Sequence, residues 1–322
     1  MVTDALITHR DGIVGAWQGG LNLPALARES NANFERWEPW VRAQVFDFTM
    51  FSHLHFTRQG DWFTLWHLQL NGAGTGGAFR RIASMRRPRR ATFLAQLGLV
   101  NGYADLREDR TPEITAQMAS PIAFWTSVAN LHPDRTRWTL ELLGAALRLA
   151  GFAEHRFKHA LACRRPLELS PQVQPIILTP GHGSLPSGHA TEAHIVAYVL
   201  WRLIRGLVDV RWREQLMRQA ARIAINRTVA GVHFPVDSAA GQMLGLTLGD
   251  YFLHRCGVGG NYDAWRFDGP AYPNLLDFDW HLQYNAAGNR PNTAYVQRTG
   301  TFDVGTAPHL RWLWLEAAAE WS

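Results

Sequence analysis

The feature that most restricts the fold is Pro186-Ser187-Gly188-His189, which is followed by an apolar run with helical spacing from Ala193 to Leu207. Pro and Gly are typical of a tight loop, and Ser is a favoured residue immediately before a helix. A helix start presents unpaired N–H groups and the positive end of the helix dipole, so it binds anions readily. We therefore expect a loop that opens a helix beside a bound anion, with His189 next to that anion.

Charged residues on both sides of this stretch strengthen the prediction. Lys158 and Arg165 are seven residues apart, two helical turns, so both cations can face one side. Further along the chain come Arg227, His233 and Asp237. Cations neutralise the oxygens of a tetrahedral or trigonal-bipyramidal oxyanion, one His bonds or attacks its central atom, and a carboxylate orients that His. A second His can then move protons.

The distribution of cations supports the same site. Lys158 is the only lysine among the 32 Lys and Arg residues of the chain. A lysine differs from an arginine as a compact ammonium that makes a point contact with an oxygen. All other cations of this kind in the chain are arginines, so the presence of a lysine at the motif position Lys158 supports a specific role for it.

These three stretches resemble the signature motifs of the superfamily that joins type 2 phosphatidic acid phosphatases, bacterial class A acid phosphatases and vanadium-dependent haloperoxidases. The family pattern is Lys, six residues, Arg-Pro; then Pro-Ser-Gly-His; then Ser-Arg, five residues, His, three residues, Asp. All three spacings hold, and the one departure is Asn226 where Ser is usual. The resemblance covers Lys158 to Asp237, and it does not extend to residues 1–110 or 258–322.

The resemblance implies a role for each motif residue. The oxygens of the anion would be bound by Lys158, Arg165, Ser187, the Gly188 N–H and Arg227. His233 would take the apical position, as phosphorylated nucleophile in a phosphatase or as vanadium ligand in a haloperoxidase. Asp237 would fix the tautomer of His233, and His189 would be the acid/base.

Two chemistries fit this site, and three features favour the peroxidase. Ala190-Thr191 resembles the haloperoxidase continuation of the motif, and His182 stands where vanadium bromoperoxidases carry a His. The N-terminus lacks the signal peptide of secreted class A acid phosphatases. One feature counts against the peroxidase, because the chain is shorter than the well-known haloperoxidases. We expect a vanadate-dependent haloperoxidase that oxidises bromide or iodide with hydrogen peroxide and halogenates small organic substrates. In this enzyme Lys158 would also be catalytic, because it would polarise the bound peroxide, and His182 would be a further catalytic residue.

The alternative is a soluble phosphatase that hydrolyses phosphate monoesters through a phosphohistidine at His233. The cofactor expected for the peroxidase is vanadate, held by His233, and phosphate can occupy the same site. Vanadate and phosphate are nearly isosteric, so the sequence leaves this choice open.

Hydrophobic periodicity predicts an all-α protein, a helical bundle of the haloperoxidase and acid phosphatase type with irregular N- and C-terminal extensions. The expected parts are residues 1–110 packed on the core, a catalytic bundle over 111–257, and a wrapping extension over 258–322. The aromatic and His-rich run from Val45 to Leu70 is interpreted as core. The expected helices are 91–106, 114–130 with a kink at Pro121, 138–149 ending at Gly151, 154–163, 187–205, 211–229, 235–254 and 309–321.

Composition limits the remaining choices. The chain is 47% hydrophobic and 18% charged, which is typical of a globular protein, and its two cysteines make no disulfide framework. No run reaches the ~18 apolar residues of a membrane span. The sequence therefore predicts a cytoplasmic protein without a membrane partner and leaves a homo-oligomer open.

The net charge of +5 raises the question of an acidic partner. The sharpest basic cluster comprises Arg80-Arg81 and Arg86-Arg87-Pro88-Arg89-Arg90. No nucleic-acid-binding motif accompanies it, so we interpret it as a solvated loop and expect no nucleic-acid partner.

Overall fold

The computed structural model describes residues 1–72, 74, 76–119, 121–204 and 210–322. The chain divides into two compact units, residues 1–37 and residues 38–322. The first unit contains α1 (Val2–Ile13) and the 3-10 helix η1 (Asn31–Arg36). The second unit contains all three sequence motifs.

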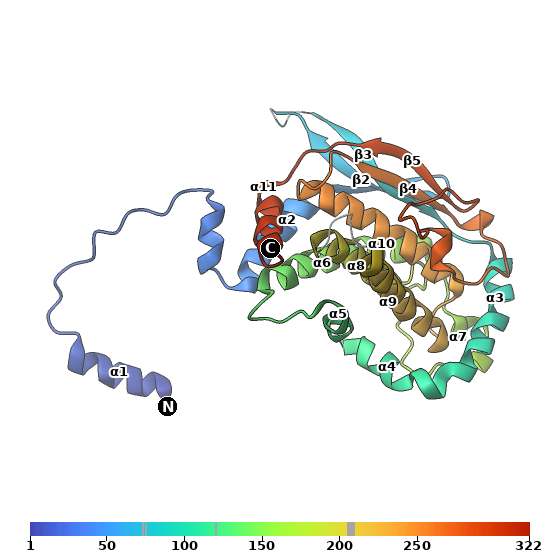
Figure 1. Ribbon diagram of the computed structural model, residues 1–322, viewed down its shortest axis with the longest axis horizontal. Helices are drawn as coiled ribbons and strands as arrows, with labels where there is room; N and C mark the ends of the chain where they lie inside the picture. The colour runs from blue at the N-terminus through green and yellow to red at the C-terminus, as the bar shows by residue number, and fades with distance from the viewer. Residues whose placement is uncertain (73, 75, 120, 205–209) are drawn as a thin grey trace. The chain divides into compact units, whose positions relative to one another are not determined.

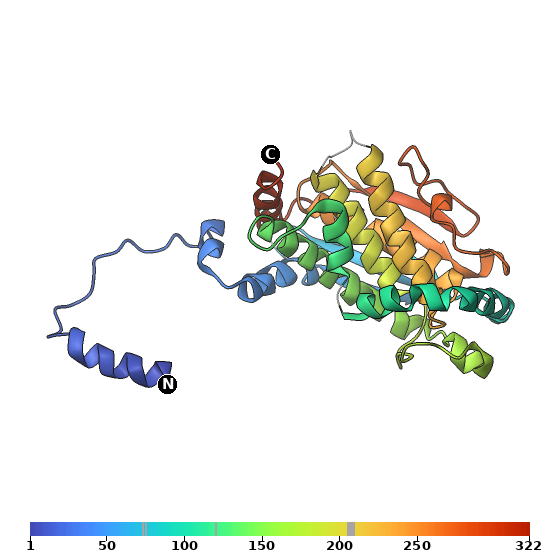
Figure 2. The same ribbon diagram turned by 60° about the horizontal axis from the view of Figure 1, so that its bottom comes forward.

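Four long helices of the second unit form a bundle, α6 (Arg137–Leu161), α8 (Gly188–Ile204), α9 (Val210–Val229) and α10 (Pro235–Arg255). Figure 2 shows α8, α9 and α10 running side by side. Asp250 is the one residue of α10 that is not fully buried. α10 is therefore the central helix of the bundle.

Smaller helices surround this bundle: α2 (Pro39–Phe51), α3 (Arg90–Gly102), η2 (Tyr103–Leu106), α4 (Arg107–Ala119), α5 (Ile122–Ala129), α7 (Pro166–Leu169), η3 (Pro171–Val173), η4 (Gly269–Ala271), η5 (Trp280–Leu282) and α11 (Pro308–Ala319). The carboxylate of Glu320, just after α11, accepts the N–H groups of Trp138 and Thr139 at 2.8 and 2.9 Å. These N–H groups belong to the first turn of α6, where a helix lacks internal acceptors. The C-terminal segment thus caps the helix that carries Lys158.

Helix positions predicted from the sequence are largely confirmed, with two differences. The expected helices 138–149 and 154–163 are one helix, α6, which continues through Gly151 because its buried face runs unbroken to Leu161. It ends at Ala162, which is left-handed with φ 46°. The expected helix 114–130 is two helices, α4 and α5, on either side of Pro121. The predicted end at Arg205 lies outside the described residues.

The all-α prediction is wrong in one respect, because the protein also contains a five-stranded mixed sheet (Figure 1). Its strands, in spatial order, are β1 (Leu54–Gln59), β2 (Trp62–Leu70), β3 (Gly77–Arg86), β4 (Tyr262–Asp268) and β5 (Val296–Phe302). Neighbouring strands are antiparallel except β3 and β4, which are parallel. The two extensions expected to be irregular therefore meet in one sheet.

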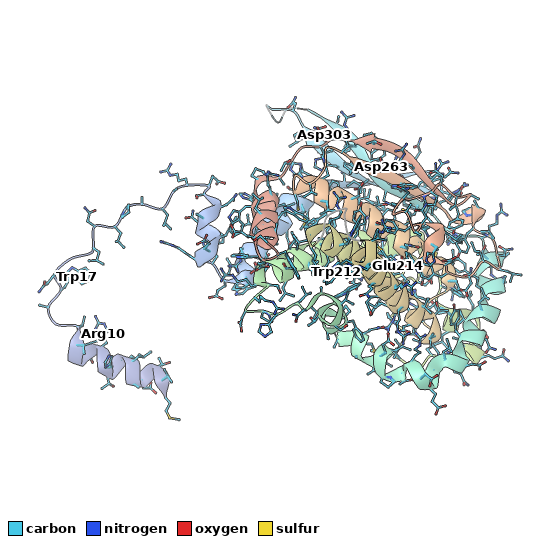
Figure 3. All side chains as sticks on the ribbon, in the orientation of Figure 1. Arg10, Trp17, Trp212, Glu214, Asp263 and Asp303 are labelled. Carbon is cyan, nitrogen blue, oxygen red and sulfur yellow. The ribbon has the colours of Figure 1, made fainter. Side chains whose placement is uncertain are left out.

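The sheet packs on α10 and fixes it from the side away from α9. His67 of β2 bonds through Nδ1 to the hydroxyl of Tyr251 at 2.8 Å, and His254 lies 3.2 Å from Asp303, just after β5. Figure 3 labels Asp303 and, on β4, Asp263. The aromatic and His-rich run is therefore core only in part. Residues 45–51 belong to α2, and the rest is mainly in β1 and β2. Phe46, Leu65 and His67 are buried, whereas Phe48 is exposed.

Among the described residues, no helix has both the length and the apolar character needed to cross a membrane. Cys163 and Cys256 are buried free thiols. Burial raises the pKa of both thiols, so they remain protonated and behave as small packed side chains.

Close contact between α8 and α10 depends on glycines. A Cβ placed on Gly241 would lie 2.7 Å from the Cβ of Ala190, and one on Gly245 would collide with the carbonyl oxygen of Thr191. These glycines follow one face of α10 at helical spacing. The start of α8, which carries the Pro-Ser-Gly-His motif, can therefore lie against the start of α10.

We expect Gly245→Ala to destabilise the protein by about 1–3 kcal/mol, because the added methyl group must displace backbone of α8. Gly151→Ala is the matched control, since a Cβ there would meet nothing within 4 Å. That helix-interior substitution should stabilise by about 0.5–1 kcal/mol. Thermal unfolding midpoints that move in opposite directions would confirm the close crossing, and a midpoint raised by both substitutions would contradict it.

Candidate oxyanion site

The structure brings all three motifs together at one end of the bundle, where five chain segments converge. The residues come from the last turn of α6 (Lys158), the extended residue before α7 (Arg165), the start of α8 (Ser187, Gly188, His189), the last turn of α9 (Arg227) and the start of α10 (His233, Asp237). The N–H of Ser187 donates to the carbonyl oxygen of Asp237 at 2.9 Å. This bond joins the start of α8 directly to the start of α10.

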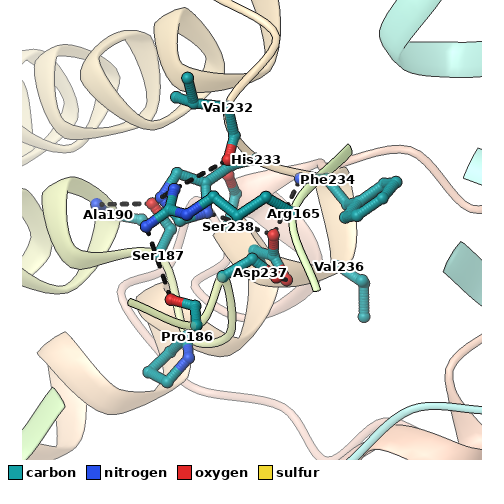
Figure 4. A network of polar contacts seen from close by, with 12 residues as sticks. Arg165, Pro186, Ser187, Ala190, Val232, His233, Phe234, Val236, Asp237 and Ser238 are labelled. Atoms are coloured by element: carbon teal, nitrogen blue, oxygen red, sulfur yellow. Dashed lines mark hydrogen bonds and ion pairs between the residues drawn. The ribbon is translucent and has the colours of Figure 1, made fainter. Parts of the chain in front are cut away.

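His233 is held between an acid and a cation (Figure 4). Its Nδ1 lies 3.2 Å from Oδ2 of Asp237, which also accepts the N–H of Phe234 at 2.9 Å. On its other side, Nε2 lies 3.1 Å from Nη1 of Arg165. Since a guanidinium can only donate, Nε2 carries the lone pair and Nδ1 carries the proton. His233 therefore presents an unprotonated nitrogen toward the cations.

Electrostatics stabilise this tautomer. Burial holds the pKa of His233 well below its ordinary value, and the charges of Arg165 and Lys158 lower it further. Burial also raises the pKa of Asp237 to about 6, although the N–H of Phe234 opposes the shift. Above that pH a neutral imidazole faces an ionised carboxylate, which is the arrangement needed in a nucleophile or a ligand.

Arg227 has unused donors. Its Nη2 donates to Oε1 of Gln117 at 2.7 Å, but Nε and Nη1 are buried without a hydrogen-bond partner in the part of the chain that the structure describes. Burial lowers the pKa of Arg227 to about 10, so the guanidinium remains charged at neutral pH. Buried donors without acceptors are costly, and the oxygens of an oxyanion would satisfy them.

His189 and His182 lie at the same site but in different surroundings. His189 has Nε2 3.3 Å from the carbonyl oxygen of Gln117, so Nε2 is the donor and Nδ1 is left as the acceptor. Burial and the charge of Arg227 lower its pKa to about 4. His182 is exposed, and its Nδ1 lies 3.2 Å from Nη2 of Arg165. Each is therefore neutral at pH 7, as burial also lowers the pKa of His182.

Lys158 contacts the loop that precedes α8. Its Nζ donates to the carbonyl oxygens of Pro186, of Ser184 at 3.3 Å and of Gly183 at 3.5 Å. Burial lowers the pKa of Lys158 to about 8. In this structure the lysine thus holds the motif loop, while Arg165 and Arg227 supply the cations nearest to the two histidines.

Glu154 is a site residue that the sequence analysis missed. It lies one turn before Lys158 on α6, only 2% exposed, and its Oε2 has no hydrogen-bond partner among the described residues. A Cβ placed on Gly188 would lie 2.5 Å from Oε1 of Glu154. Burial raises the pKa of Glu154 well above its ordinary value, and the charge of Lys158 opposes the shift. The signal available in the sequence was a Glu–Lys pair at i,i+4 on an otherwise apolar face.

Gln117 was also missed, and it explains the departure at Asn226. The Nδ2 of Asn226 donates to Oε1 of Glu113 at 2.9 Å and to Oε1 of Gln117 at 3.1 Å, while Arg110 donates to its Oδ1 at 3.0 Å. Asn226 therefore joins α9 to α4, and Gln117 positions Arg227. No local pattern indicated this, because α4 lies more than one hundred residues before α9 in the chain.

The single lysine allows a direct test of the buried charges. Lysine labelled with ¹³C at Cε should give one side-chain resonance that titrates near pH 8, against about 10.4 for an ordinary lysine. Because the Glu154 carboxylate raises the pKa of Lys158, Glu154→Gln should move this titration to lower pH. Glu168→Gln, at an exposed residue that does not act on Lys158, is the control. A wild-type titration above pH 10 would contradict the buried position.

One comparison with known proteins covers the part of the chain that forms this site. Residues 139–256, which contain every motif residue of the site, match the family model described as the PAP2 superfamily. The chain is also similar to a solved transmembrane PAP2 type phosphatidylglycerolphosphate phosphatase from Bacillus subtilis, at 19% identity over 49% of this chain and 79% of that one. The TM-score of that match is 0.28, too low to inform the fold or the activity. No curated protein matches the chain.

Proposed function

Given that residues 139–256 form a PAP2 superfamily domain, we propose that this protein is a vanadate-dependent haloperoxidase that uses hydrogen peroxide to oxidise bromide or iodide. The observation that carries the choice of peroxidase is the position of His182. Its Nδ1 lies 3.2 Å from the Arg165 guanidinium, which in turn contacts His233. An exposed imidazole at the rim of a cationic site is suited to handle halide or peroxide there.

The residues present fit vanadate. Nε2 of His233 would ligate the metal centre, and the unpartnered Nε and Nη1 of Arg227 would bind its oxygens together with Arg165. When bound, vanadate supplies a Lewis-acidic centre that activates hydrogen peroxide without a change in its oxidation state. Asp237 keeps the proton of His233 on Nδ1, so Nε2 stays available.

His189 is the proton acceptor in this proposal. Its pKa of about 4 keeps the imidazole neutral through the range in which hydrogen peroxide must lose a proton. The hydrogen bond from Nε2 to the Gln117 carbonyl leaves Nδ1 as the basic nitrogen. In a phosphatase the same residue would act as general acid and would need a proton.

One observation favours the alternative, a phosphatase acting on phosphate monoesters. Nζ of Lys158 is bonded to the carbonyl oxygens of three loop residues and is not free to polarise peroxide. In the hydrolase, Nε2 of His233 attacks phosphorus, the P–O bond to the alcohol breaks, and His189 gives a proton to the leaving oxygen. Water then cleaves the phosphohistidine.

A vanadate titration separates the two functions. Protein freed of bound anions and kept free of phosphate would be titrated with vanadate while peroxide-dependent bromide and iodide oxidation is followed. Saturable recovery of oxidation at one vanadate per chain, competed away by phosphate, supports the peroxidase. If oxidation stays at background and vanadate inhibits hydrolysis of an aryl phosphate, the protein is a phosphatase.

His182→Ala tests the observation that carries the proposal. We expect halide oxidation to fall at least about 10-fold, the equivalent of one hydrogen bond to a charged group. Hydrolysis of an aryl phosphate should change less than about 2-fold, because the substitution leaves the contacts of His233 and Arg227 in place. His132→Ala, at an exposed histidine outside the site, is the control. Unchanged halide oxidation would remove the structural reason for preferring the peroxidase.

A further inference from the structure

A second cationic cavity, of about 600 Å³, lies beside the oxyanion site and belongs to none of the chemistry proposed above. It is bordered by β1, β2, the segment between β3 and α3, and residues 160–164 at the end of α6. Its arginines are Arg58, Arg86, Arg87, Arg89, Arg90 and Arg164. Arg87, Arg89 and Arg90 are exposed, as expected for a solvated loop, and they also line this cavity together with arginines from elsewhere in the chain. Arg80 and Arg81 of the same sequence cluster lie in β3 and do not line it.

Most of this positive charge is not neutralised by the protein. Arg86 pairs with Asp268 at 2.5 Å, and Arg164 lies 3.6 Å from Glu168. Within the described ranges, Arg87, Arg89 and Arg90 make no ion pair. Of the residues that the structure describes, Asp61 is the only acidic one that lines the cavity. Several like charges around one cavity repel each other unless an anion of matching charge enters.

The cavity also has an apolar wall. Phe63, Phe93, Leu161 and Leu169 line it beside the arginines. The guanidinium of Arg58 lies 5.5 Å from the ring of Phe63, so a charged group and an aromatic group are adjacent in this wall. A volume of this size is typical of small-molecule sites that combine apolar walls with a few polar anchors.

Consecutive residues of one chain segment contribute to the cavity and to the oxyanion site. Ala162, Cys163 and Arg164 line the cavity, whereas the next residue, Arg165, directs its guanidinium toward His182 and His233. None of the motif residues lines the cavity.

We propose that this cavity binds an organic polyanion, a small molecule that carries two or more phosphate-type charges next to an aromatic or other apolar body. The arginines bind the charged groups, and the phenylalanine and leucine side chains contact the body. The proposal is independent of the activity assigned to the oxyanion site. A cavity of this size suits a small ligand better than a nucleic acid, which is recognised along an extended basic surface.

The probe is the β,γ-methylene analogue of ATP, which combines a polyphosphate with an aromatic base and resists hydrolysis. Its binding to the full chain would be measured by calorimetry, with tripolyphosphate and adenosine as the separate halves. We expect saturable binding at one ligand per chain, weaker binding of tripolyphosphate and none of adenosine. Replacing Arg87, Arg89 and Arg90 together by Ala should weaken binding at least about 30-fold, since three charge-assisted contacts are lost.

Two further variants make the result specific. Replacing Arg10, Arg28 and Arg36 by Ala removes the same net charge from residues that do not line the cavity, and it should change affinity less than about 3-fold. Arg227→Ala should also leave affinity unchanged. Equal losses in both triple variants, or loss in Arg227→Ala alone, would overturn the proposal. Tighter, arginine-dependent binding of a single-stranded oligonucleotide would overturn it in favour of a nucleic-acid surface.

Discussion

Replacing His233 by Ala is expected to abolish turnover, with a loss of at least about 10³-fold in kcat for halide oxidation and for ester hydrolysis alike. Its Nε2 is the unprotonated nitrogen that faces Arg165, and Nδ1 is already committed to Asp237. The same atom would be the vanadium ligand in the proposed peroxidase and the phosphorus nucleophile in the alternative phosphatase, so either activity would be lost with it. Activity assays on the purified variant, with vanadate binding measured in parallel, test this expectation.

A second variant keeps the interpretation clear if His233→Ala folds poorly. His233 is buried, and its removal leaves the Asp237 carboxylate with fewer donors, which costs about 1–3 kcal/mol. His233→Asn retains a polar side chain near Asp237 and should fold while remaining inactive. Retention of more than a tenth of wild-type turnover in a folded His233→Asn protein would rule out the assigned role.

Arg227→Ala should lower kcat/KM by about 10²–10³-fold, the usual cost of removing one donor from an oxyanion site. Its Nε and Nη1 are buried and unpartnered among the described residues, whereas Nη2 is fixed by Gln117. An oxyanion is therefore the natural acceptor for two of its donors. Inhibition by vanadate or phosphate should weaken in parallel, because the ground-state anion uses the same contacts.

Arg218 provides the matched control for Arg227. It lies on the same helix, α9, but is exposed and pairs with Glu214, which Figure 3 labels. An exposed pair of this kind contributes about 0–1 kcal/mol, so Arg218→Ala should leave activity unchanged. Gln117→Leu adds a finer test: it keeps Arg227 but removes its acceptor, so it should raise KM more than it lowers kcat. Equal effects of the Arg218 and Arg227 substitutions would contradict the assigned site.

The fold and the site differ in how much of each could be predicted from the sequence. The start of α8 could be predicted from Pro186, Ser187 and Gly188, and the start of α10 from Pro235. Both are local signals, because a helix start depends on residues within about four positions of it. The sheet could not be predicted in the same way. Its central pairing joins Ala83 to Trp265 and Arg86 to Asp268, about 180 residues apart. β3 shows no regular alternation of buried and less buried residues, and the alternation in β4 is interrupted at Ala264 and Trp265.

Gly188 illustrates the same limit within the site. The sequence indicated that a glycine at a helix start allows an anion to approach the backbone. The structure shows in addition that the carboxyl group of Glu154 occupies the space a side chain would need. Access for an anion and space for the Glu154 carboxyl group thus both require a glycine at this position. The second requirement is visible only in the packing of α6 against α8.

The sequence by itself indicated the residues of the proposed site, because the motif spacings place three cations, two histidines and one carboxylate around a helix start. Tertiary structure alone decided their state. The pKa values of Lys158, His189 and Asp237 are shifted first by burial, and burial depends on which distant segments cover each side chain. It also decided that the arginines after β3 line a cavity, since the opposite wall comes from the end of α6. Residue types and their short-range spacing can be taken directly from the sequence. The desolvation of a side chain and its contacts with residues distant in sequence arise only when the chain folds.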